Sequence, residues 1–173
     1  MQGERIYFCI DLKSFYASVE CVERGQDPFN YKLVVADSSR GEGAICLAVS
    51  PALKALGVGG RCRLFEIPKD VEYTIAKPRM KLYMEYSSEI YSIYLSFFCK
   101  EDIHVYSVDE CFVDVTEYLS LYNMHPRELA EKFVGEIYNK TNITSNPGFN
   151  NSIYYKLFYN KIRSFRSFSR IKT

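Results

Sequence analysis

Three carboxylates at the ends of strand-like segments are the residues of this sequence best suited to chemistry. Asp109 and Glu110 are adjacent in the middle of the alternating segment 103–115, and Asp11 ends the apolar, β-prone segment 6–11. Adjacent carboxylates beside apolar residues lose hydration, which is unfavourable unless a cation binds them. If the two segments are neighbours in one sheet, the three acids converge at its edge and can bind a hard divalent cation that handles phosphates. A solvated turn is the alternative interpretation of an Asp-Glu pair, and the apolar flanks argue against it.

The segments around these acids predict an α+β fold. Two long amphipathic helices on one face of a sheet of strands are typical of this class. A smaller α/β subdomain is expected over about 31–76, between the two acid-bearing strands. The expected strands are 6–11, 31–37, 44–49 and a pair within 103–115 that is hinged at the acidic turn; the expected helices are 14–23, with Ser14 as the N-cap, 52–57, 81–99 and 126–138.

A lysine near a predicted helix start is the next candidate. Lys54 follows Ser50-Pro51, where proline suits the first turn of a helix, and its ammonium could hold a phosphate. On spacing alone, an ordinary exposed lysine is the competing interpretation. The glycine-containing loop 38–43 lacks the spacing and the Lys-Ser/Thr pair of a P-loop, so a surface turn is expected there.

Composition and charge limit the classes of protein that fit. The chain has 173 residues, of which 47% are hydrophobic, and this is enough for one domain with a real core. The net charge of +1 hides an asymmetry. Residues 1–136 carry all 21 acids and 15 of the 22 Lys and Arg, whereas residues 137–173 carry seven basic residues and no acid. The carboxyl-terminal part is therefore a different kind of sequence.

The six cysteines form no CxxC pair, and no His stands at zinc-ligand spacing, so neither a zinc ribbon nor a redox pair is expected. Cysteines within apolar segments and an amino terminus without a signal peptide predict a cytoplasmic protein. No run of about 18 apolar residues exists, so no membrane span is expected. His104 and His125 are expected to be structural or surface residues, and Ser/His or Cys/His nucleophilic catalysis has no support.

Three patches taken together resemble, in order and spacing, the amino-terminal part of Y-family (UmuC/DinB-type) translesion DNA polymerases. They are Ile10–Glu20, Ser50–Val58 and Tyr106–Asp114. The stretch Arg63–Pro68 is most similar to the UV-damage-repair-like members of Gram-positive bacteria. The resemblance implies a right-hand polymerase with a ferredoxin-like palm sheet covered by helices and a small inserted α/β fingers subdomain. The implied parts are 1–16 (first palm strand), 17–78 (fingers), 79–145 (palm continuation) and 146–173 (a divergent basic tail), with thumb and little finger absent.

The same resemblance implies a two-metal site built from the three acids. Asp11 and Asp109 would bind two magnesium ions, the backbone carbonyl of Leu12 would add a ligand, and Glu110 would be the third acid, near the primer 3′ end. Two ions about 4 Å apart can activate the 3′-hydroxyl and stabilise the leaving pyrophosphate in an in-line phosphoryl transfer. Asp11, Asp109 and Glu110 are thus the implied catalytic residues.

The resemblance also implies substrate-binding residues and partners. Tyr16, with Phe15 beside it, would be the steric gate under the sugar that rejects a 2′-hydroxyl, and Lys54 would contact the triphosphate. The implied substrates are a DNA primer-template and a dNTP, used in error-prone synthesis across DNA damage, as in the SOS response. A monomer is expected, and sliding-clamp contacts belong to the full-length members of the family.

The carboxyl-terminal part departs from the family pattern. Residues 142–150 are a partial echo of the last palm strand and its turn, and the sequence from 154 onward does not align. Its bias toward Asn, Ile, Lys, Tyr and Phe is typical of an AT-rich gene read out of frame, which predicts a truncated product that binds primer-template poorly. The rival interpretation is a non-catalytic remnant or interaction module whose basic tail binds DNA. A nucleotide cyclase is a third interpretation, and the Phe15-Tyr16 pair and the inserted fingers argue against it.

Overall fold

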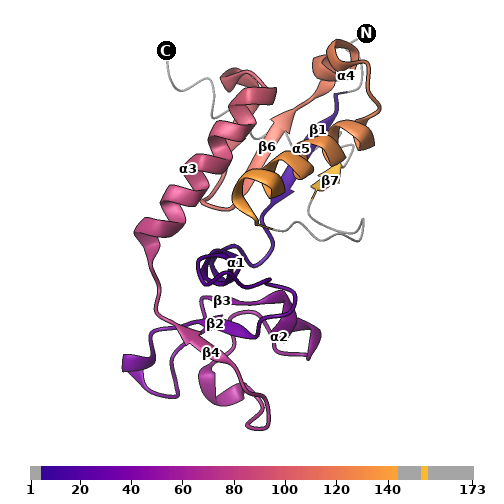
Figure 1. Ribbon diagram of the computed structural model, residues 1–173. Helices are drawn as coiled ribbons and strands as arrows, with labels where there is room; N and C mark the ends of the chain where they lie inside the picture. Colours follow the sequence, from indigo (N-terminus) through magenta and orange to yellow (C-terminus); the bar gives the residue numbers. More distant parts are fainter. Residues whose placement is uncertain (1–4, 144–152, 156–173) are drawn as a thin grey trace.

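The computed structural model describes residues 5–143 and 153–155 as two sheets with helices around them (Figure 1). Within this described part of the chain, no helix combines the length and the apolar character needed to cross a bilayer. The strands are β1 (Tyr7–Asp11), β2 (Leu33–Val35), β3 (Ala48–Val49), β4 (Thr74–Ala76), β5 (Ile103–Val105), β6 (Glu110–Asp114) and β7 (Ile153–Tyr155). The α-helices are α1 (Phe15–Val22), α2 (Pro51–Ala55), α3 (Met80–Phe97), α4 (Thr116–Tyr122) and α5 (Pro126–Thr141).

The larger sheet joins the two acid-bearing strands. Its order is β5-β6-β1-β7, and β1 runs antiparallel to both of its neighbours. The register of β1 and β6 sets Tyr7 opposite Asp114 and Asp11 opposite Glu110. β5 pairs with β6 on the other side, so these two strands flank the acidic turn as predicted. The predicted α+β class is confirmed.

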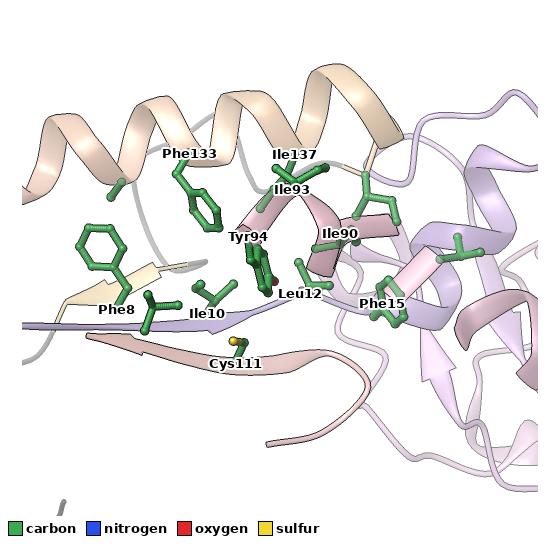
Figure 2. Packing of buried hydrophobic residues seen from close by; sticks show 14 of the residues in the cluster. Phe8, Ile10, Leu12, Phe15, Ile90, Ile93, Tyr94, Cys111, Phe133 and Ile137 are labelled. Atoms are coloured by element: carbon green, nitrogen blue, oxygen red, sulfur yellow. The ribbon is translucent and has the colours of Figure 1, made fainter. Parts of the chain in front are cut away.

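Helices α3 and α5 cover one face of this sheet (Figure 1). Because side chains alternate along β1, Phe8, Ile10 and Leu12 all lie on the covered face, and Figure 2 shows them packed with Tyr94 and Phe133. The ring centroids of Tyr94 and Phe133 are 5.2 Å apart. Most of the apolar stripe predicted for the helix over 81–99 is confirmed as core. Its buried members are Tyr83, Ile90, Ile93 and Tyr94, whereas the other two predicted members, Tyr86 and Phe97, are partly buried and pack against that core.

The smaller sheet belongs to the segment inserted between the acid-bearing strands. Its order is β3-β2-β4, with β2 antiparallel to β3 and parallel to β4. β2 is buried on both faces, because Leu33 and Val35 pack in the main core and Val34 packs in a second apolar cluster. Helix α1 lies between the two sheets (Figure 1) and contacts both β2 and α3. The first helix after Asp11 therefore links the two cores.

The apolar run 44–49 forms less strand than the sequence predicts. The Cys46 N–H donates to the Cys62 carbonyl at 2.8 Å, and the Leu64 N–H donates to the Ala44 carbonyl at 3.0 Å. The first half of the run is therefore paired with residues 62–64. The Leu47 N–H donates to the Val35 carbonyl of β2 at 2.8 Å, and Ala48 and Val49 pair with β2 as β3. The local pattern predicts an extended segment correctly, but two different partners divide it.

Three further elements were not predicted: strand β4, helix α4 and strand β7. Helix α4 begins where Oδ1 of Asp114 accepts hydrogen bonds from the Thr116 N–H at 3.1 Å and the Thr116 hydroxyl at 2.6 Å, a short-range signal that the sequence contains. Strand β7 pairs with the outer side of β1, whereas the echo of the last palm strand was expected within 142–150, of which 144–150 lie outside the described residues. Apart from β7, the predicted tail 146–173 lies outside the described residues.

Candidate active site

The acid-bearing ends of β1 and β6 lie together at one end of the larger sheet. Asp11 is the last residue of β1, Glu110 is the first residue of β6, and the two are opposite each other in the ladder. The Leu12 N–H donates to the Asp109 carbonyl at 3.0 Å, which extends the pairing by one more step. The register thus brings Asp11 to the adjacent pair Asp109 and Glu110, from which it is remote in the sequence.

Two serines hold the acidic turn. The Ser107 hydroxyl lies 2.9 Å from Oδ1 of Asp109 and 3.2 Å from Oε2 of Glu110. Because a hydroxyl has one proton, it can donate to only one of these acids at a time. Ser87 of α3 donates to the Val108 carbonyl at 2.6 Å and fixes the turn to the helix. Sequence reasoning missed Ser107, although a serine two residues before an aspartate in a turn is a local signal for such a contact.

Charges from three elements meet at this edge. Burial raises the pKa of Asp11 above its ordinary value, and the negative charges of Asp109 and Glu110 raise it further, while Lys54 opposes them. Loss of hydration lowers the pKa of Lys54, Lys13 lowers it further, and Asp11 acts in the opposite direction. Lys54 belongs to α2, so a basic group of the inserted segment lies within electrostatic range of the acids.

The residues at this edge offer oxygen atoms as donors to a ligand. Among residues 5–143 and 153–155, no group of three or more His, Cys, Asp or Glu side chains is arranged as a metal cluster. The donor type nevertheless fits a hard divalent cation, because the carboxylates around Asp11 repel one another and a cation would relieve that repulsion. The Leu12 carbonyl accepts the Phe15 N–H at 3.1 Å and keeps a second lone pair.

The junction of β1 and α1 is strained at Ser14. This residue has a φ of 54°, in the left-handed region that non-glycine residues rarely adopt. It occupies the N-cap position as predicted, but its side chain makes no capping bond, since a left-handed cap lacks the extended backbone of an ordinary one. Its Oγ is buried without a hydrogen-bond partner in the described ranges. Strain and an unsatisfied polar atom at one position are typical of ligand sites.

The two aromatic residues that begin α1 have different environments. Phe15 is 2% exposed and packs in the main core. Tyr16 is half-buried, and its ring stacks on that of Tyr83 with centroids 4.6 Å apart and planes 15° apart. Burial raises the pKa of Tyr16, and the charge of Asp109 raises it further, so this phenol lies within range of the acids. Of the predicted pair, Tyr16 is the ring with surface left for a substrate.

A buried serine begins the helix that carries Lys54. Oγ of Ser50 accepts hydrogen bonds from the Leu53 N–H at 3.4 Å and the Leu33 N–H at 3.0 Å, so it caps α2 and ties it to β2. Pro51 takes the first helical position, as predicted. Lys54 is exposed on a helix whose start is fixed to the sheet.

Comparison with known proteins identifies relatives over most of the described residues. The family model of the impB/mucB/samB family (IMS) matches residues 10–155. The putative UV-damage repair protein UvrX of Bacillus subtilis (strain 168) is 43% identical over 107 residues, which are 61% of this chain and 26% of UvrX. The DNA repair protein homolog YozK of the same strain is 42% identical over 102 residues, 58% of this chain and 89% of YozK. DNA polymerase IV 2 of that strain is 31% identical over 151 residues, 86% of this chain and 35% of the polymerase.

A solved structure has a similar fold. The crystal structure of DinB from Sulfolobus solfataricus superposes with a TM-score of 0.67 at 27% identity, and the match covers 80% of this chain and 40% of DinB. The chain thus spans about a quarter to two fifths of UvrX, DNA polymerase IV 2 and DinB, and most of YozK.

Proposed function

Because the chain belongs to the impB/mucB/samB family, we propose that it supplies the palm (1–16 and 79–145) and the fingers (17–78) of a DNA-directed DNA polymerase for error-prone translesion synthesis in DNA repair. The observation that carries this proposal is the meeting of Asp11 with Glu110 at the end of β1 and β6, with Asp109, Lys54 and Tyr16 all within electrostatic range. The substrates would be a DNA primer-template and a dNTP.

The acids would form the metal site. Asp11 and Asp109, with the carbonyl of Leu12, would hold two magnesium ions, and Glu110 would lie near the primer 3′ end. Bound magnesium supplies the positive charge that activates the 3′-hydroxyl and stabilises the leaving pyrophosphate. The protein's own contribution is position: the β1–β6 register sets Asp11 opposite Glu110, and the Ser107 hydroxyl lies within hydrogen-bond distance of both acids of the turn and would orient the one to which it donates.

The residues around α1 and α2 would hold the nucleotide. Lys54 would bind the triphosphate, whose negative charge suits an ammonium group that lies within electrostatic range of Asp11. Tyr16 would fill the space that a 2′-hydroxyl needs, with Phe15 supporting it from the core. The unsatisfied Ser14 hydroxyl offers a further donor at the same junction.

A second candidate function is a non-catalytic palm-and-fingers remnant or DNA-binding interaction module. YozK favours this candidate, because its match of 102 residues with this chain covers 89% of its own length. The chain covers only 35% of DNA polymerase IV 2, so polymerisation by the whole protein is a proposal. The truncated state, the monomer and the sliding-clamp contacts stay predictions.

Binding of a fluorescent dATP analogue, with and without Mg²⁺, separates the two candidates. We expect metal-dependent binding by the wild type, its loss in Asp109→Ala, and its retention in Asp70→Ala, which removes an exposed aspartate of the inserted segment. Circular dichroism checks that all three proteins are folded. A folded wild type without metal-dependent binding would refute the polymerase proposal and favour the second candidate.

A further inference from the structure

A fully buried carboxylate lies one helical turn after Tyr16. Glu20 is 0% exposed, and a buried charge is unfavourable unless hydrogen bonds and opposite charges compensate it. Arg79 supplies two bonds, from Nε to Oε1 and from Nη2 to Oε2, both at 2.9 Å. Nη1 of Arg24 donates to Oε2 at 2.5 Å, and the Tyr83 hydroxyl donates to Oε1 at 2.8 Å. We call these four residues the Glu20 network.

The network keeps the carboxylate ionised. Burial alone would raise the pKa of Glu20, but the hydrogen bonds from Arg79, Arg24 and Tyr83 outweigh it and leave the pKa below its ordinary value. A bidentate arginine fork on a carboxylate adds geometric restraint as well as energy. The carboxylate is therefore a fixed anchor for the Tyr83 hydroxyl.

The network also joins elements that are remote in the sequence. Glu20 lies on α1, whereas Arg79 is the N-cap of α3 and Tyr83 lies in its first turn. This is the point where the chain returns from the inserted segment to the larger sheet (Figure 1). The ring of Tyr83 is 0% exposed, and its face stacks on Tyr16 at 4.6 Å. One side chain thus connects the buried anchor with the ring at the candidate site.

We infer that Glu20, Arg79 and Tyr83 are positioning residues that hold the Tyr16 ring in place and thereby set the discrimination between deoxyribonucleotides and ribonucleotides. The inference rests on the proposed role of Tyr16 as the gate under the sugar. A ring excludes a 2′-hydroxyl only as strongly as it resists rotation, and Tyr16 cannot swing toward Tyr83 unless Tyr83 moves. Tyr83 resists because its hydroxyl is bonded to the anchored carboxylate and its ring is enclosed by core. Supporting contacts of this kind fix the geometry of groups that touch a substrate.

Tyr83→Phe in the full chain is the test, because it keeps the stacked ring and removes only the bond to Glu20. The matched control is Tyr86→Phe, which removes a hydroxyl bond of the same length, 2.8 Å to Oε1 of Glu23, from the same helix. Arg79→Lys is the second test variant, since it keeps the charge and loses the two-pronged contact. Fluorine NMR of a fluorotyrosine placed at position 16 alone reports the motion of that ring without any nucleotide.

We expect one narrow resonance for the wild type and for Tyr86→Phe, and a broadened or split resonance for Tyr83→Phe and Arg79→Lys. With Mg²⁺, the ratio of the dissociation constants for ATP and dATP should fall about 3–10-fold in the two test variants and stay unchanged in the control. Test variants that match the control in both measurements would overturn the inference. A wild type that binds neither nucleotide would refute the proposed function instead, and the resonance of residue 16 would still decide whether the network positions the ring.

Discussion

Replacing Asp11 with Asn is expected to stabilise the metal-free protein while removing its response to magnesium. Asp11 lies directly opposite Glu110 and is also repelled by Asp109. Facing cross-strand residues have Cβ atoms about 5 Å apart, and at an effective dielectric constant of about 60 each like-charge pair costs about 1 kcal/mol. Solvent still reaches the partly desolvated Asp11 carboxylate, and the substitution also loses the attraction of Lys54, so about half of that repulsion is expected to survive as a gain.

The net gain is thus about 1 kcal/mol, which raises the melting temperature of a chain of this length by about 2–4 °C. Thermal unfolding followed by circular dichroism, in low salt with a chelator, measures it. Added salt should shrink the difference, because it screens exposed charges. Added Mg²⁺ should then stabilise the wild type and not the variant, as expected for a ligand that binds only the native site. Asp70→Asn is the control. A variant that melts below the wild type without metal, or gains as much from Mg²⁺, would refute this account of the site.

Substitutions at Arg79, Ser50 and Ser107 are expected to have four further outcomes. Arg79→Ala should lower the free energy of unfolding, measured in urea, by about 2 kcal/mol. The control Lys81→Ala breaks an exposed ion pair and should change this free energy by less than about 0.5 kcal/mol. Equal losses in the two variants would contradict a structural role for the buried carboxylate. The pKa of Glu20 is lowered in the folded state, so its ionised carboxylate stabilises the folded protein fully above the ordinary glutamate pKa, and this stabilisation is lost as pH falls through the folded pKa. The free energy of unfolding of Arg79→Ala should therefore depend less on pH below about 4.5 than that of the wild type. Ser50→Ala should cost about 1–2 kcal/mol, since two backbone N–H groups lose their acceptor, and a neutral result in urea unfolding would contradict the capping role. Ser107→Ala should leave the melting temperature nearly unchanged and weaken Mg²⁺ binding about 3–10-fold by calorimetry; unchanged affinity would show that this hydroxyl does not orient the acids.

Local patterns in the sequence determined much of the fold. The alternation in 6–11 and 103–115 identifies β1, β5 and β6, and the spacing of apolar residues identifies α1, α3 and α5, because these periods depend only on which face of an element is buried. The apolar flanks of the Asp109-Glu110 pair, together with Asp11 at a strand end, were enough to predict a shared sheet edge. The Ser50-Pro51 pair predicted the start of α2 for a similar reason, since caps and first-turn prolines act within a few residues.

Only the tertiary structure decided which segments meet. The run 44–49 divides between two partners, and β7 is chosen as the neighbour of β1, because strand pairing is set by the space left in a sheet and not by local propensity. The same holds for two of the three partners in the Glu20 network, since only Arg24 is close to Glu20 in the sequence. An acid on the apolar side of a short helix looks unfavourable in the sequence, and the compensating Arg79 and Tyr83 follow only after the whole inserted segment. The sequence thus determined the acids and the elements that carry them, whereas long-range packing decided what surrounds Tyr16, since buried charges are tolerated only where distant partners converge.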